Sequence, residues 1–153
     1  MLMADPQTAL HETRRVLREG GKLAMSVWGN AAENPWASLP GRTLMEQTGA
    51  SPPDPTAPGI FAMADPERTR SMLEASGFEV QRMEDVRMTW PFESFDAYWR
   101  FLTEVAGAIA VVIAALPEEE QRALRGRIEE ATETYRADGG YEFPGVAQNT
   151  LAA

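Results

Sequence analysis

Residues 5–28, DPQTALHETRRVLREGGKLAMSVW, decide the fold of this chain. Asp5 followed by Pro6 is a typical helix start, because the carboxylate accepts from first-turn amides and the proline needs no partner there. Gly20 and Gly21 end the helix, since glycine adopts the left-handed conformation that closes many helices. The next run, residues 22–28, lacks polar alternation, which is typical of a strand covered on both faces in a parallel sheet. The stretch predicts a helix that leads through a tight turn into a buried strand.

A second segment follows the same pattern. Residues 64–78 read ADPERTRSMLEASGF, and an alternating stretch follows as far as Trp90. The tetrapeptide MADP opens both segments, and we interpret it as helix capping used twice. An anion site is disfavoured because each proline removes a donor, and a true repeat is disfavoured because the segments do not align beyond their glycines. Two helix–strand units predict crossover connections in an α/β sheet.

The remaining segments add helices and one more strand to a single predicted domain of 153 residues. Residues 106–116, AGAIAVVIAAL, are too short to cross a membrane, which takes about 20 apolar residues, and predict a buried helix. Other helices are predicted from Pro35, Ser94 and Pro117, and a final strand from Tyr141. We therefore expect about three strands, with helices packed on them and a helical insertion.

Composition excludes several classes of function. The net charge of −9 disfavours nucleic acid and anionic membrane surfaces as partners, because both require a basic face. The chain has no cysteine, which fits a reducing cytoplasm, and the single histidine, His11, cannot build a metal cluster. We expect a cytoplasmic protein with no metal site, no nucleic-acid partner and no membrane partner.

The order of these segments resembles the class I S-adenosylmethionine-dependent methyltransferases, in the small-molecule, type 11 branch that includes ubiquinone and menaquinone biosynthesis enzymes. Residues 15–21, RVLREGG, are similar to the family's helix end before its fifth strand, and NPW at residues 34–36 follows that strand. The stretch DPERTRSMLEASGF and the closing strand also match in order. The resemblance covers nearly the whole chain and implies a partial Rossmann-like sheet made of the family's last three strands.

One part of the family pattern is missing. The chain contains no glycine-rich turn from a strand into a helix, because Gly20-Gly21 and Gly139-Gly140 both follow helices. The resemblance therefore implies the C-terminal half of a methyltransferase domain without its cofactor-binding N-terminal half. S-adenosylmethionine is implied as cofactor by the resemblance only, no residue is assigned to its binding or to catalysis, and the isolated monomer is expected to be inactive.

The remaining candidates are residues that could line a small-molecule pocket. Ligands of α/β sheets bind beyond the carboxyl ends of strands, which is where residues 28–36 fall. Several aromatic side chains from later segments could complete an acceptor pocket, although the same side chains could instead form a core. The candidates are Trp28, Asn30, Asn34, Trp36, Phe61, Trp90, Tyr98 and Phe101.

Three functions stay open at this point. The chain is a methyltransferase-family protein that binds a small ligand or a partner without catalysis, a subunit completed by another chain, or a structural homo-oligomer. The resemblance implies that the strand of residues 22–28 is flanked by a fourth strand in the whole family domain. Without that neighbour its edge presents unpaired backbone groups beside apolar side chains. We expect a homodimer or larger assembly through this edge.

Overall fold

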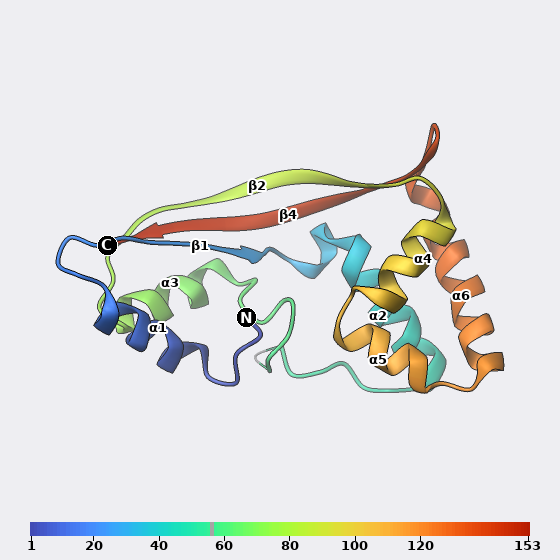
Figure 1. The fold of residues 1–153 in the computed structure, drawn as a ribbon, viewed down its shortest axis with the longest axis horizontal. Coiled ribbons are helices and arrows are strands. Elements are labelled where there is room, and N and C mark those ends of the chain that lie inside the picture. The colour runs from blue at the N-terminus through green and yellow to red at the C-terminus, as the bar shows by residue number, and fades with distance from the viewer. Residues whose placement is uncertain (56) are drawn as a thin grey trace. The chain divides into compact units, whose positions relative to one another are not determined.

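The computed structural model describes residues 1–55 and 57–153, and its helices and sheet make the chain α/β, as predicted (Figure 1). The helices are α1 (Pro6–Val16), α2 (Pro35–Thr48), α3 (Pro66–Ala75), α4 (Phe95–Glu104), α5 (Ala108–Ala115) and α6 (Glu118–Thr132). The strands are β1 (Leu23–Trp28), β2 (Val80–Phe92), β3 (Arg136–Ala137) and β4 (Gly140–Ala152). Two short 3-10 helices are η1 (Ala31–Glu33) and η2 (Glu133–Tyr135).

These elements divide into two compact units. Unit 1 consists of Met1–Asn34, Pro53–Met88 and Val146–Ala153. Unit 2 consists of Pro35–Pro52 and Thr89–Gly145. Strands β2 and β4 contribute residues to both units, so each unit is assembled from separate segments of the chain.

The two predicted helix starts are confirmed. The Asp5 carboxylate accepts from the amide of Thr8 at 2.9 Å, and Pro6 is the first residue of α1. The Asp65 carboxylate accepts from the amide of Glu67 at 3.0 Å, at the start of α3. The repeated tetrapeptide is therefore used for the same local purpose in both places.

Strand order in the sheet is β1-β4-β2, with β3 paired to β4. β1 is antiparallel to β4, with Leu23 opposite Ala152 and Trp28 opposite Ala147. Glu79 and Ala153 exchange two backbone hydrogen bonds of 2.8 and 3.0 Å, which is the pattern of an antiparallel pair between the strands of β2 and β4. β1 and β2 consequently run in the same direction, and β4 separates them.

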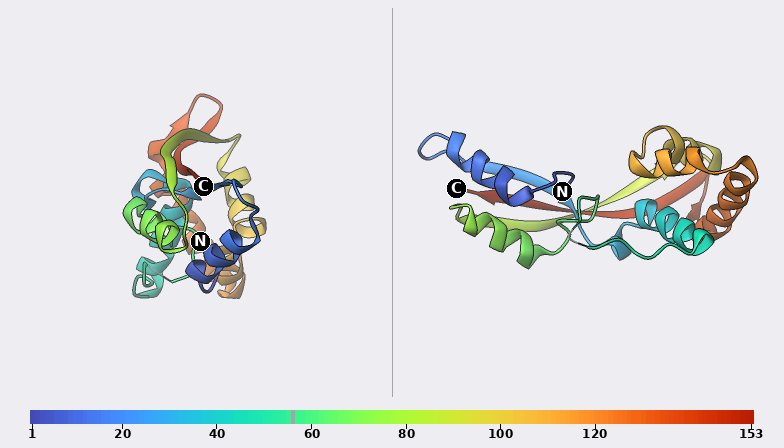
Figure 2. Two further views of the ribbon diagram at one scale, coloured as in Figure 1. Left: turned by 90° about the vertical axis from the view of Figure 1, so that its left-hand side faces the viewer. Right: turned by 90° about the horizontal axis from the view of Figure 1, so that it is seen from below.

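Helices α1 and α3 lie side by side on one face of the sheet in unit 1 (Figures 1 and 2). Their buried residues form a core with inward residues of the strands, namely Leu10, Val27, Met63, Met72, Leu73, Phe78 and Ala152. On β1, Ala24 and Ser26 are exposed whereas Val27 is buried. The prediction of a strand covered on both faces is therefore wrong, because no helix of unit 1 covers the small side chains of Ala24 and Ser26 on its other face.

Unit 2 contains α2, α4, α5 and α6 with the adjoining parts of β2 and β4. Its fully buried residues include Leu102, Ile113, Leu124 and Phe143. Gly140 is required at the start of β4, because a Cβ there would overlap the carbonyl oxygen of Phe92.

The prediction of a buried helix in residues 106–116 is wrong. α5 spans Ala108–Ala115 and buries only Ile113, while Val111 and Val112 are 71% and 45% exposed. An eight-residue helix that packs against α4 buries one side, even though its residues are apolar all round. Among the described residues no single helix meets the length and hydropathy of a membrane span; only α4 and α5 together do so, with a 96° bend between them.

Candidate functional site

The predicted site residues fall into two groups, one in each unit. Trp28, Asn30, Asn34 and Phe61 belong to unit 1, and Trp36, Trp90, Tyr98 and Phe101 belong to unit 2.

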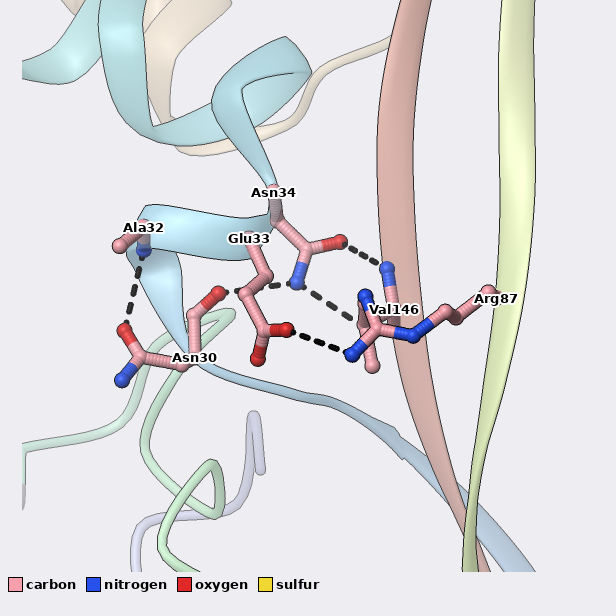
Figure 3. Close-up of polar contacts among 6 residues, drawn as sticks. All are labelled: Asn30, Ala32, Glu33, Asn34, Arg87 and Val146. Atoms are coloured by element: carbon pink, nitrogen blue, oxygen red, sulfur yellow. Dashed lines mark hydrogen bonds and ion pairs between the residues drawn. The ribbon is translucent and has the colours of Figure 1, made fainter.

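The unit 1 group centres on the turn that follows β1. Asn30 caps η1, and its side-chain oxygen accepts from the amide of Ala32 at 3.0 Å (Figure 3). Gly29 donates to the carbonyl of Val146 at 2.9 Å. A Cβ at position 29 would come within 3.2 Å of Val146, so the close approach of the turn to β4 favours glycine. The turn is therefore held close to β4.

Asn34 fixes this turn through its side-chain amide, which is 0% exposed. Its Nδ2 donates to the carbonyls of Asn30 and Val146, both at 3.0 Å, and its Oδ1 accepts from the amide of Val146 at 3.0 Å (Figure 3). The side chain thus pairs with Val146 as a neighbouring strand residue would. These bonds give Asn34 a structural role, whereas the candidate Asn30 is exposed and Trp28 is half-buried.

An ion pair borders the same turn. An Arg87 guanidinium nitrogen lies 3.1 Å from a carboxylate oxygen of Glu33 (Figure 3). The two side chains are 73% and 42% exposed, so the pair stabilises the fold little. Neither residue is among the candidates predicted from the sequence, because no sequence spacing relates position 33 to position 87.

Phe61 lies half-buried in the turn region before α3. Its carbonyl accepts from the amide of Ala64 at 3.1 Å. A role in ligand binding stays a prediction for this residue.

The four candidates of unit 2 form one aromatic cluster. Trp36 and Trp90 are stacked with ring centroids 4.7 Å apart, and the Phe101 ring lies 6.1 Å from each. The Tyr98 hydroxyl donates to the carbonyl of Trp36 at 2.7 Å. Burial raises the pKa of the Tyr98 phenol well above its usual range, so the hydroxyl stays protonated and remains a donor.

This cluster continues into the core of unit 2. Tyr98 also contacts Phe92 and Phe143, with centroid distances of 5.0 and 4.6 Å. Trp36 is 5% exposed and Tyr98 is 0% exposed, which is the packing expected of a core. Trp90 and Phe101 are half-buried and form the accessible part of the cluster. The grouping is thus established, and its use as an acceptor pocket stays a prediction.

Two buried polar side chains in β4 lie outside the predicted set. Gln148 and Thr150 are 4% and 3% exposed, and Gln148 Oε1 and Thr150 Oγ1 have no hydrogen-bond partner among the described residues. They are opposite Val27 and Met25 of β1. Positions 148 and 150 lie two and four residues before Ala152, which belongs to the unit 1 core. Alternate residues of a strand share a face, so this spacing in the sequence could have placed both side chains facing inward.

The described residues do not fit the cofactor that the resemblance implies. The turn from β1 leads into α2 through Pro35, which removes an amide from the helix start where an anion would bind. Gly20 and Gly21 precede β1, and Gly139 lies between β3 and β4. Among the residues that the structure describes, no three histidine, aspartate or glutamate side chains lie close enough together to hold a metal ion.

The similarity of this chain to known proteins is a similarity of structure. No family model matches the chain, and no curated protein matches it in sequence. The chain is similar over 98% of its length to the crystal structure of a protein from Bacillus halodurans C-125 that is described as "a putative methyltransferase". The two chains are 20% identical with a TM-score of 0.49, and this chain spans 63% of the length of that protein. At this identity and TM-score the similarity assigns no activity to the chain.

Proposed function

We propose that this chain forms the acceptor side of an S-adenosylmethionine-dependent methyltransferase that acts on a small molecule. The glycine-rich segment that holds the cofactor lies outside these 153 residues and comes from another segment or another chain. The observation that carries the proposal is the rigid turn at the carboxyl end of β1, which leads into the sequence NPW at residues 34–36. Ligands of α/β sheets bind at that end of a strand.

The hydrogen bonds of the turn divide its residues into two roles. Asn34 is buried and holds the backbone of Asn30 and Val146 through its side-chain amide, so it acts as a positioning residue. Asn30 is exposed and Trp28 is half-buried, so these two side chains can contact a bound molecule. An amide and an aromatic ring suit an acceptor with both polar and planar apolar parts.

Methyl transfer makes modest demands on such a site. It needs the donor and acceptor held in line and water excluded, and both depend on rigid placement more than on a reactive side chain. Absence of a catalytic acid or base among the candidates therefore does not argue against this reaction. S-adenosylmethionine would supply the methyl group, and no step of the transfer is assigned to residues of this chain.

The first test is calorimetric titration of the purified chain with S-adenosylhomocysteine. We expect no binding up to millimolar ligand, because the glycine-rich turn is outside the chain. Micromolar binding would contradict the proposal that the cofactor site lies elsewhere.

The second test adds the missing segment. Co-expression with a glycine-rich βαβ segment encoded beside this chain should give a complex that binds S-adenosylhomocysteine. In that complex Asn30→Ala and Trp28→Ala should lower methyl transfer and leave S-adenosylhomocysteine affinity unchanged. His11→Gln, on the exposed side of α1, is the control that should change neither quantity. A complex that binds the cofactor product but transfers methyl groups equally well with all three variants would refute the acceptor role.

A second candidate function is a non-enzymatic module that binds a small ligand or a partner. The observation that favours it is the disagreement between the described residues and a cofactor site. A chain that binds an apolar ligand and associates with itself, without any effect of a glycine-rich segment, would support this alternative.

A further inference from the structure

The sheet of unit 1 has two edges with opposite characters. β2 forms one edge and carries Arg82, Glu84, Asp85 and Arg87. β1 forms the other edge, and its six residues LAMSVW include no charged side chain. Charged side chains on edge strands prevent pairing with other chains. The edge at β2 is thus protected, and the edge at β1 is not.

The backbone of β1 can accept another strand. Among the described residues β1 has β4 as its only strand neighbour. Gly29, one residue beyond β1, donates to Val146 of β4. Because hydrogen-bonding direction alternates along an antiparallel pair, the backbone groups of Ala24 and Ser26 are directed away from β4. The partner that satisfies such groups is an extended strand.

Side chains beside this edge are incompletely covered. Leu23 and Met25 are half-buried on the face covered by helices, where Val27 is fully buried. A strand added at β1 would also bring apolar side chains that cover part of this surface.

We propose that β1 pairs with β1 of a second copy of this chain, antiparallel and around a two-fold axis that passes through Met25. This arrangement places Leu23 opposite the partner's Val27, and Ala24 opposite the partner's Ser26. Lys22 then lies opposite the partner's Trp28, where an ammonium group and an indole attract each other. The resemblance places the missing half of the domain on this same edge of β1, so the proposal concerns the chain without that segment and does not depend on a cofactor.

The register follows from the alternation of the strand. The helix-covered faces of both copies stay on one side of the joined sheet only if odd residues pair with odd residues. An axis at Ser26 also satisfies this condition, but it places Leu23 opposite the partner's Gly29 and the large Trp28 opposite the small Ala24. The axis at Met25 instead pairs apolar with apolar and small with small residues.

Charge favours a second copy as the occupant of this edge. Each chain carries a net charge of −9, so two copies repel wherever acidic surfaces meet. The sequence has no acidic residue between Glu19 and Glu33, so pairing along β1 avoids that repulsion. A two-fold arrangement is also closed, because the same edge is used once by each copy.

Cysteine cross-linking tests the axis directly, because the chain has no native cysteine. Residues opposite each other in a non-hydrogen-bonded antiparallel pair have Cα atoms about 4.5 Å apart, within the range of about 4.4–6.8 Å that a disulfide spans. We expect Met25→Cys to form a covalent dimer on mild oxidation, seen by non-reducing electrophoresis. Val86→Cys on the protected edge is the matched control and should form no covalent dimer under the same conditions. Equal cross-linking of both variants, or none by Met25→Cys, would overturn the proposed axis.

A charge test separates self-pairing from other association. Ala24→Lys combined with Ser26→Lys places like charges opposite each other across the axis, while both side chains are exposed in the monomer. Sedimentation at tens of micromolar should show a dimer for the unaltered chain and a monomer for this variant. Mixing it with the Ala24→Glu, Ser26→Glu variant should restore a dimer containing one copy of each. The proposal would be refuted if the unaltered chain were a monomer, or if each charged variant still formed a dimer by itself, before mixing. Circular dichroism checks that each variant is folded.

Discussion

Replacing Asn34 with alanine should destabilise the protein strongly, although the residue is not part of a helix or strand. The substitution removes the three hydrogen bonds described above, but it does not leave three groups without partners. The carbonyl of Val146 still accepts from Gly29, and the carbonyl of Asn30 still accepts from Glu33 at 3.0 Å. Of the groups joined by these three bonds, the buried amide of Val146 is the one that loses its described partner.

The expected loss of stability follows from these lost bonds and the groups they leave behind. A buried donor without a partner costs about 1–3 kcal/mol, and each lost bond whose partner stays satisfied contributes about 0.5–1.5 kcal/mol. We therefore expect Asn34→Ala to lower the free energy of unfolding by about 2–4 kcal/mol, allowing for the overlap of these contributions. Asn30→Ala is the matched control, because it removes one exposed capping bond worth about 1 kcal/mol.

Urea unfolding followed by tryptophan fluorescence measures both variants, since the chain has four tryptophans. Asn34→Asp gives a further check. Its carboxylate can accept from Val146 but meets two carbonyl oxygens where Nδ2 donates in the natural side chain, so the charged form is disfavoured and the folded-state pKa is raised. The stability of this variant should rise relative to the unaltered chain as pH falls from about 7 to about 4. A cost for Asn34→Ala no larger than that of Asn30→Ala would refute the reasoning.

Four further substitutions test the packing by the same unfolding measurement. Tyr98→Phe should lower stability by about 1–3 kcal/mol, because a buried carbonyl loses its hydroxyl donor; no change would mean that water replaces it. Thr150→Val should be neutral or stabilising, since Oγ1 has no partner among the described residues, and a clear loss would indicate a bond to water. Gly140→Ala should prevent normal pairing at the start of β4, whereas Gly126→Ala, with open space at its Cβ in the middle of α6, should stabilise by up to about 1 kcal/mol. Similar effects of the two glycine substitutions would contradict the clash at Gly140.

Local sequence signals predicted the start of several elements well. Asp5 and Asp65 with their following prolines located two helices, because the capping interaction depends only on neighbours in the sequence. The strand of residues 22–28 was located within one residue for the same reason, since glycine ends the preceding helix. Such signals need no knowledge of the rest of the fold.

Burial was predicted less well, because it depends on what lies opposite. The small side chains of Ala24 and Ser26 read as part of an apolar run, yet no helix of unit 1 covers them. The apolar residues of α5 likewise gave no sign that only Ile113 faces a neighbour. The antiparallel placement of β4 beside β1 joins residues more than a hundred positions apart, and no local pattern carries that information.

The candidate site shows the same division. The sequence grouped Trp36, Trp90, Tyr98 and Phe101 by residue type, and the structure brings them into one cluster. It could not distinguish Asn30 from Asn34, because the difference lies in the bonds that Asn34 makes with Val146. A side chain that pairs with a distant backbone has no local signature.

The interleaving of the two units has a consequence for synthesis on the ribosome. Unit 1 takes its middle strand from residues 146–152, although its outer strands precede residue 89. Neither outer strand can pair in its native position until the segment after residue 145 has left the ribosome. Folding of unit 1 is therefore completed only after those residues are made, and the unpaired β1 and β2 must be kept from aggregating until then. Unit 2 is made from residues 35–52 and 89–145, so it can form first.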